Sequence, residues 1–249
     1  MSAQIGNTIL SSLPRRELIA LEPLIERVPL AQGRVIEASR KEIESVWFME
    51  QGLASMFIEA DRYKSVEVGM VGYEGLVGSS VLNGVRKALT KTIIQVPGTA
   101  WRIDAEDFVQ MLPSCPQLEN SCRYFYQNLV WQMAGTALSN ARGHIEQRLA
   151  RWLLMCQDRI GGVHIRITHD YLAAMLGVRR PGVTNALHTL EGEGFVRSTR
   201  VNIEILDRQR LEAFAGSFYG EAERMRQHRT TTDGTQARPQ QGTFGTVHS

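Results

Sequence analysis

Residues 35 to 103 consist of short segments rich in β-branched and aromatic side chains, separated by glycine or polar residues at hairpin-like spacing. Such segments with regular turns between them predict strands. The predicted strands are 35–36, 46–49, 53–58, 66–71, 92–96 and 99–103, and the predicted turns are 51–52, 60–62, 83–84 and 97–98. Several short strands in this order predict a β-sandwich or barrel, here a jelly-roll-like one of about 70 residues.

Helical patterns lie on both sides of this β region. Residues 13–28 carry apolar side chains at three- and four-residue spacing and predict one or two short helices broken near Pro23. Residues 104–107 resemble a helix start with acids in its first turn. A long helix is expected beyond Pro116, and its apolar stripe has the narrow spacing of a coiled-coil seam.

This stripe predicts a homodimer interface, while the alternative is that the stripe packs on the chain's own β domain. The expected interface residues are Leu118, Cys122, Phe125, Leu129, Met133, Thr136 and Asn140.

Residues 168 to 205 carry the strongest local pattern. Thr168 is a good N-cap for a short helix with one apolar face, and Gly177 breaks that helix. A second helix begins at residues 180–181, with proline in its first turn and an inward stripe from Val183 to Leu190. Residues 195–206 read as two short strands of a β wing, so the segment predicts a winged helix-turn-helix. A further helix over 145–160, ended by residues 161–162, precedes it.

The net charge of +2 conceals a division of the chain. Residues 1–140 carry 13 Lys+Arg against 15 Asp+Glu, whereas residues 141–229 carry 14 Arg, no Lys and 10 Asp+Glu. Because the arginine fork suits phosphate and guanine edges, this bias favours a nucleic-acid partner, although solvated helix faces produce similar biases. Cys115, Cys122 and Cys156 form no CxxC pair and are expected to be buried apolar side chains.

Several other classes of protein lack their signals here. No apolar run reaches the roughly 18 residues of a membrane span and no signal peptide is evident, so a cytoplasmic protein without a membrane partner is expected. The first histidine is His144, and no GxSxG, P-loop or HExxH motif occurs. We therefore expect no enzyme activity, no metal and no cofactor. Residues 227–249 lack an apolar period and are expected to be disordered.

The order of β-roll, long helix and the segment IEQRLARWLL…ITHDYLAAMLGVRRPGVTNALHTLEGEGFV resembles the cyclic-AMP receptor/fumarate-nitrate regulator (Crp/Fnr) family of bacterial transcription factors, over about residues 15–220. The resemblance implies an α+β fold with a cyclic-nucleotide-binding-type β jelly roll (1–115), a dimerisation helix (116–143) and a winged helix-turn-helix (144–226). It also implies a homodimer bound to a palindromic site in double-stranded DNA, with RNA polymerase as a further partner.

The family's recognition start is altered in this chain. Arg180 keeps the family's arginine and suits a guanine, whereas Pro181 and Asn185 replace the usual glutamate and second arginine. The base preference should therefore differ from the family's usual half-site. The expected DNA contacts are Thr168, His169, Arg179, Arg180, Gly182, Thr184, Asn185, His188 and Arg200.

The effector cassette departs further from the family. Members that bind cyclic AMP carry Gly-Glu for the ribose hydroxyl and Arg-Ser for the phosphate, but here Ser79 follows Gly78 and no basic residue aligns cleanly with the phosphate position. Because a missing carboxylate removes affinity and discrimination, we expect that cyclic AMP is not the ligand. Glu74 has the alternative role of a solvated turn residue. The candidate pocket residues are Gly72, Glu74, Gly78, Ser79, Ser80, Arg86 and Lys91.

A rival interpretation remains open. The chain could be a small-molecule-binding or enzymatic cupin-like protein whose winged helix contacts protein rather than DNA. Such a protein would need a metal cluster or a polarised nucleophile, and the sequence offers no evident candidate for either.

Overall fold

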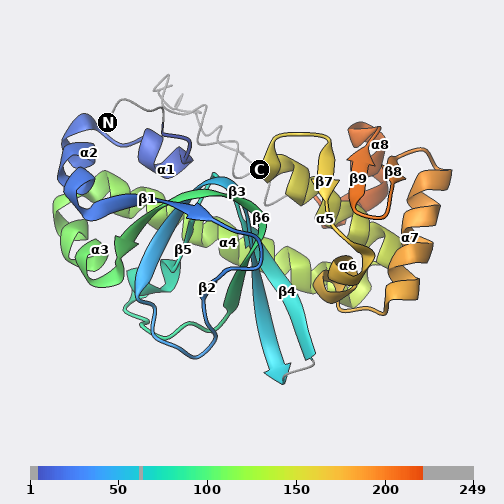
Figure 1. The fold of residues 1–249 in the computed structure, drawn as a ribbon, viewed down its shortest axis with the longest axis horizontal. Helices are drawn as coiled ribbons and strands as arrows, with labels where there is room; N and C mark the ends of the chain where they lie inside the picture. The colour runs from blue at the N-terminus through green and yellow to red at the C-terminus, as the bar shows by residue number, and fades with distance from the viewer. Residues whose placement is uncertain (1–4, 62–63, 221–249) are drawn as a thin grey trace, which may run out of the picture.

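The protein is described by a computed structural model over residues 5–61 and 64–220. The predicted tail 227–249, the end of the expected domain 144–226 and Arg62 of the predicted turn 60–62 lie outside the described residues. Figure 1 shows an N-terminal sheet flanked by helices, a C-terminal group of helices with a small sheet, and a long helix that runs between them. This mixed architecture confirms the predicted fold class, while the exact domain limits stay a prediction.

The large sheet is antiparallel, and its strands are β1 (Ile25–Leu30), β2 (Val35–Glu37), β3 (Ser45–Asp61), β4 (Lys64–Val71), β5 (Leu76–Val77) and β6 (Lys91–Asp104). The strand order is β1-β6-β3-β4, with β2 paired to β6 and β5 paired to β3. β3 and β6 form the central pair, because β1 pairs with the outer side of β6 and β4 pairs with the outer side of β3. The strands roll around a core that includes Phe48, Ile94 and Ile103, all essentially inaccessible to solvent.

β3 and β6 each run through a position where the sequence predicted a turn, so the predicted turns at 51–52 and 97–98 are wrong. Gly52 has a φ of +87°, and a Cβ there would lie 2.4 Å from the carbonyl oxygen of Val96. A Cβ on Gly98 would lie 2.0 Å from the carbonyl oxygen of Gln51. The register of the pair also shifts here, so the two glycines mark facing irregularities at which both strands bend together.

The N-terminal helices are shorter than the apolar spacing predicted. α1 (Thr8–Ser11), α2 (Arg15–Leu21) and a 3-10 turn (Glu22–Leu24) precede β1. Residues 25–28, predicted to be helical, belong to β1, and Ile25 pairs with Ile103 of β6. Pairing with a buried strand overrides the local helical spacing here. The predicted helix start at 104–107 is confirmed as α3 (Ala105–Met111), because the Asp104 carboxylate accepts a bond from the backbone N–H of Glu106.

The long helix α4 (Pro116–Arg142) packs on the chain's own β domain. Leu118, Cys122, Phe125 and Leu129 lie in the β-domain core and are at most 7% exposed. The Gln132 amide exchanges two hydrogen bonds with the backbone of Met70 in β4, at 2.7 and 3.1 Å. The expected dimer stripe is therefore turned inward.

The rest of that stripe is also used within one chain. Met133 packs against the β-domain core, the Thr136 hydroxyl accepts a bond from Arg151, and the Asn140 side chain accepts one from Arg148. The expectation of a dimer interface on this face is wrong for the buried members, and the alternative of packing on the β domain accounts for them.

The C-terminal part consists of α5 (Ile145–Ile160), β7 (His164–Arg166), α6 (His169–Leu176), α7 (Arg180–Gly192), β8 (Val196–Ser198), β9 (Asn202–Ile205) and α8 (Arg208–Ala215). α5 ends at Gly161, whose φ is +65°, where the sequence predicted its end. β8 and β9 form the predicted wing, and β7 joins them in a sheet of order β7-β9-β8. β7 was not predicted, because a three-residue strand is too short to display a period, and the short helix α8 was not predicted either.

The two parts share an apolar cluster. Leu53, Phe57 and Met70 of the large sheet belong to the same buried group as residues of α5 and α6. Within the described part of the chain, none of the helices is both long enough and apolar enough to cross a membrane.

Candidate nucleic-acid interface and ligand pocket

α6 and α7 form a tight helical pair joined at Gly177. The Thr168 hydroxyl accepts a bond from the backbone N–H of Tyr171 and so caps α6. Gly177 has a φ of +61° and ends the helix, because left-handed backbone is favourable for glycine. The inner face of α7 is fully buried, which confirms the predicted stripe of Val183, Ala186, Leu187 and Leu190.

The outer face of α7 carries a compact polar surface. Arg179, Arg180, Asn185 and His188 are exposed, and Thr184 is half-buried beside them. The Thr184 hydroxyl donates to the carbonyl oxygen of Arg180 at 3.2 Å, which holds it against the helix. The structure therefore brings these five predicted contacts together along one helix, from its N-cap Arg179 to His188.

Two of the predicted contacts, Thr168 and His169, lie at the start of α6, and their surroundings differ from each other. Thr168 is exposed, but the His169 ring turns toward α7, with Nδ1 3.3 Å from the Thr184 hydroxyl. The Nε2 atom of His169 is buried without a hydrogen-bond partner among the described residues. Next to it, Arg180 forms an exposed ion pair with Asp170, with Nε and Oδ1 3.4 Å apart.

The last two predicted contacts flank this surface. Arg200 is exposed in the turn of the wing, which is closed by a 2.8 Å hydrogen bond from the Thr199 N–H to the Asn202 carbonyl oxygen. Gly182 lies in the first turn of α7, and a Cβ there would be 3.4 Å from a methyl group of Ile145. That is ordinary contact, so packing within the chain does not require glycine at this position.

Part of the arginine bias has a structural explanation that composition could not reveal. Arg151 and Arg159 of α5 are each only 6% exposed. Arg151 donates to the backbone carbonyl groups of Gln132 and Phe218, at 3.1 and 2.8 Å. The positive charge available to a nucleic acid is therefore smaller than the count of arginines suggests.

Two buried polar contacts join α5 to the β domain, and sequence reasoning missed both. The Trp152 indole N–H donates to the Glu67 carboxylate of β4 at 3.0 Å, and Arg159 Nε bonds Glu74 Oε1 at 2.7 Å. Burial raises the pKa of Glu67 to about 7. Only isolated acids within apolar segments mark such positions in the sequence, and they do not indicate their partners.

The seven predicted effector residues have different surroundings. Gly72 and Glu74 lie against Arg159, so Glu74 is a buried ion-pair partner and not a solvated turn residue. Gly78, Ser79 and Ser80 lie where the 3-10 turn Ser79–Asn83 begins, and a Cβ on Gly78 would clash with the backbone of Ser45. Arg86 is exposed and Lys91 forms an ion pair with Glu59. That these seven residues form an effector pocket stays a prediction.

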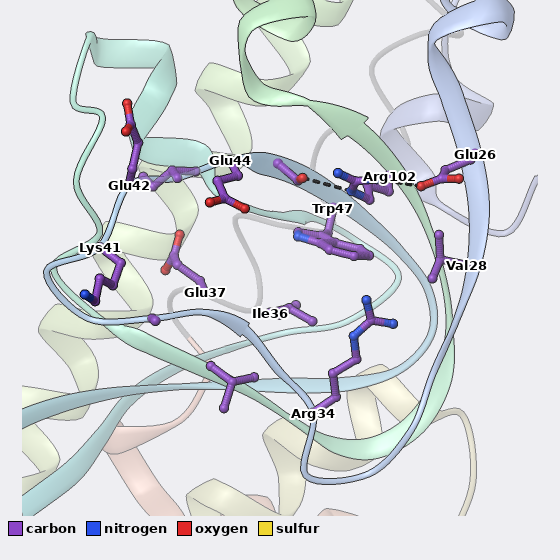
Figure 2. Close-up of a pocket in the computed structure, with 14 residues that line it drawn as sticks. Glu26, Val28, Arg34, Ile36, Glu37, Lys41, Glu42, Glu44, Trp47 and Arg102 are labelled. Carbon is purple, nitrogen blue, oxygen red and sulfur yellow. Dashed lines mark hydrogen bonds and ion pairs between the residues drawn. The ribbon is translucent and has the colours of Figure 1, made fainter.

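The β domain nevertheless has a pocket, at a different place. Its volume is about 620 Å³, and Figure 2 shows it beside β1 and β2, with Trp47 at its wall. Glu37 lies in it, and its Oε1 accepts hydrogen bonds from the Thr90 and Thr92 hydroxyls at 3.0 and 3.1 Å. Burial raises the pKa of Glu37 despite these two bonds, which lower it. Within the described residues, no group of three or more His, Cys, Asp and Glu is arranged to hold a metal ion.

Comparisons with known proteins agree with this architecture. Residues 147–214 match the family model of the Crp-like helix-turn-helix domain. A search of curated proteins finds no match. Among solved structures, the chain is similar to a transcriptional regulator of the Crp/Fnr family from Eubacterium rectale, with 19% identity and a TM-score of 0.65 over 84% of this chain and 98% of that one.

Two further structures are similar at lower identity. One is the c-di-GMP responsive global regulator CLP from Xanthomonas campestris, with 14% identity and a TM-score of 0.65 over 77% of this chain and 99% of that one. The other is FixK2 from Bradyrhizobium japonicum, with 14% identity and a TM-score of 0.66 over 78% and 98%. The comparisons therefore show a Crp-like helix-turn-helix domain and, over most of the chain, the fold of Crp/Fnr regulators.

Proposed function

We propose that this chain, in which a Crp-like helix-turn-helix domain completes the fold of Crp/Fnr regulators, is a DNA-binding transcriptional regulator that acts as a homodimer on a palindromic site. The observation that carries the proposal is α7, whose inner face is buried and whose outer face presents Arg179, Arg180, Asn185 and His188 to solvent. A helix of this kind enters the major groove and reads base edges with its N-terminal residues.

Individual side chains on this surface suit different parts of a DNA duplex. Arg180 can bind guanine O6 and N7 with two donors, and Asn185 can bind adenine N6 and N7. The ion pair between Arg180 and Asp170 is exposed, so the arginine can leave it at little cost when DNA approaches. Thr168, His169 and Arg200 lie at the sides of α7, where we assign them to the phosphate backbone.

A second copy of the chain has a seam available on α4, on the face opposite the buried stripe. Its exposed residues recur at alternating spacings of four and three, which is the repeat of a coiled coil. Trp131 is 38% exposed and Leu138 is 51% exposed, which is high for large apolar side chains on a helix. We assign the dimer seam to Gln127, Trp131, Ala134, Leu138 and Ala141.

The dimer would present two copies of α7. Its twofold symmetry would place them in successive major grooves, about 34 Å apart along the DNA. We further infer that cyclic AMP is not the effector, because Ser79 stands where the family carries a glutamate, and Glu74 of the cassette is held in an ion pair with Arg159. RNA polymerase is the partner through which such a regulator would act on transcription.

Selection of random duplex DNA by the purified, ligand-free protein at physiological salt tests the proposal. The expected result is enrichment of a palindrome whose half-sites are one helical turn apart. The matched control is the protein with Arg180→Ala and Asn185→Ala together, which should enrich no palindrome while the protein stays folded. If neither protein enriches a sequence, with or without a panel of nucleotides and metabolites, the chain is not a sequence-specific DNA-binding protein.

A further inference from the structure

We propose that the pocket beside β1 and β2 binds a small zwitterion with a primary ammonium group and a carboxylate, such as an α-amino acid or a short peptide. This inference goes beyond the proposed function, because it assigns a ligand class without reference to DNA. The pocket volume of about 620 Å³ lies within the range of small-molecule sites in proteins.

The pocket is separate from the cassette that the sequence suggested. Its lining comes from β1, from residues 34–38, from residues 41–45, and from Trp47 and Arg102 of the central strand pair. No lining residue belongs to residues 72–91 or to α4. A ligand here would therefore contact the β domain alone.

One end of the pocket is acidic. Figure 2 shows the carboxylates of Glu37 and Glu44 near the same space, with Glu42 and Lys41 at its edge. Glu37 uses Oε1 for Thr90 and Thr92, which leaves Oε2 for the pocket. Glu42 and Glu44 are exposed and have no ion pair among the described residues. Carboxylates placed in this way suit an ammonium group, whose three donors they can accept.

The other end carries guanidinium groups on either side of an indole ring. Arg34 lies 5.1 Å and Arg102 5.7 Å from the centroid of Trp47. Arg102 is already bound by Glu26 at 2.7 Å and by Ser45 at 2.9 Å, so Arg34 is the cation left for a ligand at this end. Arg34 is exposed, and the one hydrogen bond of its side chain among the described residues is a long one of 3.3 Å to the Pro29 carbonyl oxygen. A ligand carboxylate matches its donors.

Trp47 supplies the observation that points to a bound molecule. The residue is 5% exposed, and its Nε1 is buried without a hydrogen-bond partner among the described residues. Figure 2 shows this nitrogen directed to the side of the pocket where Glu37 and Glu44 lie. Because an unpaired buried donor is costly, a ligand carboxylate that binds Arg34 and also accepts from Nε1 would remove this cost, with the ammonium group beyond it on the side of Glu37 and Glu44.

Calorimetric titration of the full-length protein without DNA tests the proposal. The probes are each of the proteinogenic L-amino acids and alanyl-alanine, at up to millimolar concentration. The expected result is binding of at least one probe, with affinity lost about tenfold or more when its amine is acetylated or its carboxylate is converted to an amide. Absence of binding by every probe overturns the proposal, and so does equal binding of a blocked form or of putrescine, an amine without a carboxylate.

Variants of the pocket locate the binding. Glu37→Gln and Arg34→Gln should each weaken the probe about tenfold or more, whereas Glu106→Gln, an exposed change in α3, should leave its affinity unchanged. Arg34 is exposed, so its replacement does not endanger the fold. Binding that all three variants retain would overturn the assignment to this pocket. None of these measurements involves DNA, so their failure is distinguishable from failure of the proposed regulator function.

Discussion

Glu67 shows how one buried carboxyl group can make the stability of this protein depend on pH. Burial raises its pKa from about 4.5 to about 7, so between these values the folded chain holds a proton that the unfolded chain releases. The free energy of unfolding therefore falls as the pH rises through this window. Above pH 7 the unfavourable contribution of Glu67 reaches at most about 3 kcal/mol.

Glu67→Gln should abolish this dependence, because glutamine is neutral and still offers an oxygen to Trp152. Urea unfolding of both proteins at pH 5 and pH 8 measures the effect. We expect the variant to be the more stable protein at pH 8, by up to about 3 kcal/mol, and close to the wild type at pH 5. A difference that is equal at both pH values would show that charge on Glu67 is not its cause.

Arg180 is the residue on which sequence specificity should depend most. Arg180→Ala should cost about 1–3 kcal/mol on the selected operator and relax the preference at one base position. Competition binding against scrambled DNA at fixed salt measures both effects. Arg16→Ala removes the same charge from an exposed site on α2, and its operator affinity should match the wild type. Equal losses for the two variants would reduce the role of Arg180 to general electrostatics.

At the scale of elements, the bend shared by β3 and β6 makes a prediction about glycine. Gly52→Ala places a Cβ 2.4 Å from the Val96 carbonyl oxygen at a φ of +87°, whereas Gly33→Ala introduces a similar φ of +82° with nothing within 4 Å. Left-handed backbone costs alanine about 1–2 kcal/mol at either site, and the clash adds about 1–3 kcal/mol at Gly52 alone. Denaturant unfolding should therefore rank Gly52→Ala clearly below Gly33→Ala. Equal losses would mean that the strands relax around the new methyl group.

The same elements show which features the sequence could predict. The helix-turn-helix was predicted almost residue by residue, because its caps, its Gly177 turn and its inward stripe are all local signals. Residues 51–52 and 97–98 carry the ordinary signals of turns, and only pairing of the two distant strands makes them bends. The stripe of α4 likewise has coiled-coil spacing whether it faces a second chain or its own β domain. Contacts between residues that are far apart in the sequence decide these cases, and the periodicity of one segment does not predict such contacts.

The candidate sites show the same difference between local signals and long-range contacts. The residues predicted on α7 were brought together because one helix carries them. The cassette residues were chosen by a family pattern that this chain follows only loosely, and their common pocket stays a prediction. The Trp47 pocket was missed altogether, since its charged residues come from several strands and a connecting segment, with no motif to join them.

At the scale of the whole molecule, assembly depends on the outer face of α4. Leu138→Glu places a charge in the middle of the proposed seam, where pairing with a second copy would bury it without a partner. We expect the dimer dissociation constant to rise about tenfold or more, as measured by sedimentation velocity over a concentration series. Operator affinity should fall with it, because both half-sites are then no longer held by one complex.

Ile19→Glu is the matched control for this assembly test. It makes the same kind of change at an aliphatic side chain that is 59% exposed on α2, close to the 51% of Leu138, but remote from α4's outer face. Its dissociation constant should equal that of the wild type. If Leu138→Glu stays dimeric while remaining folded, the seam on α4 is wrong.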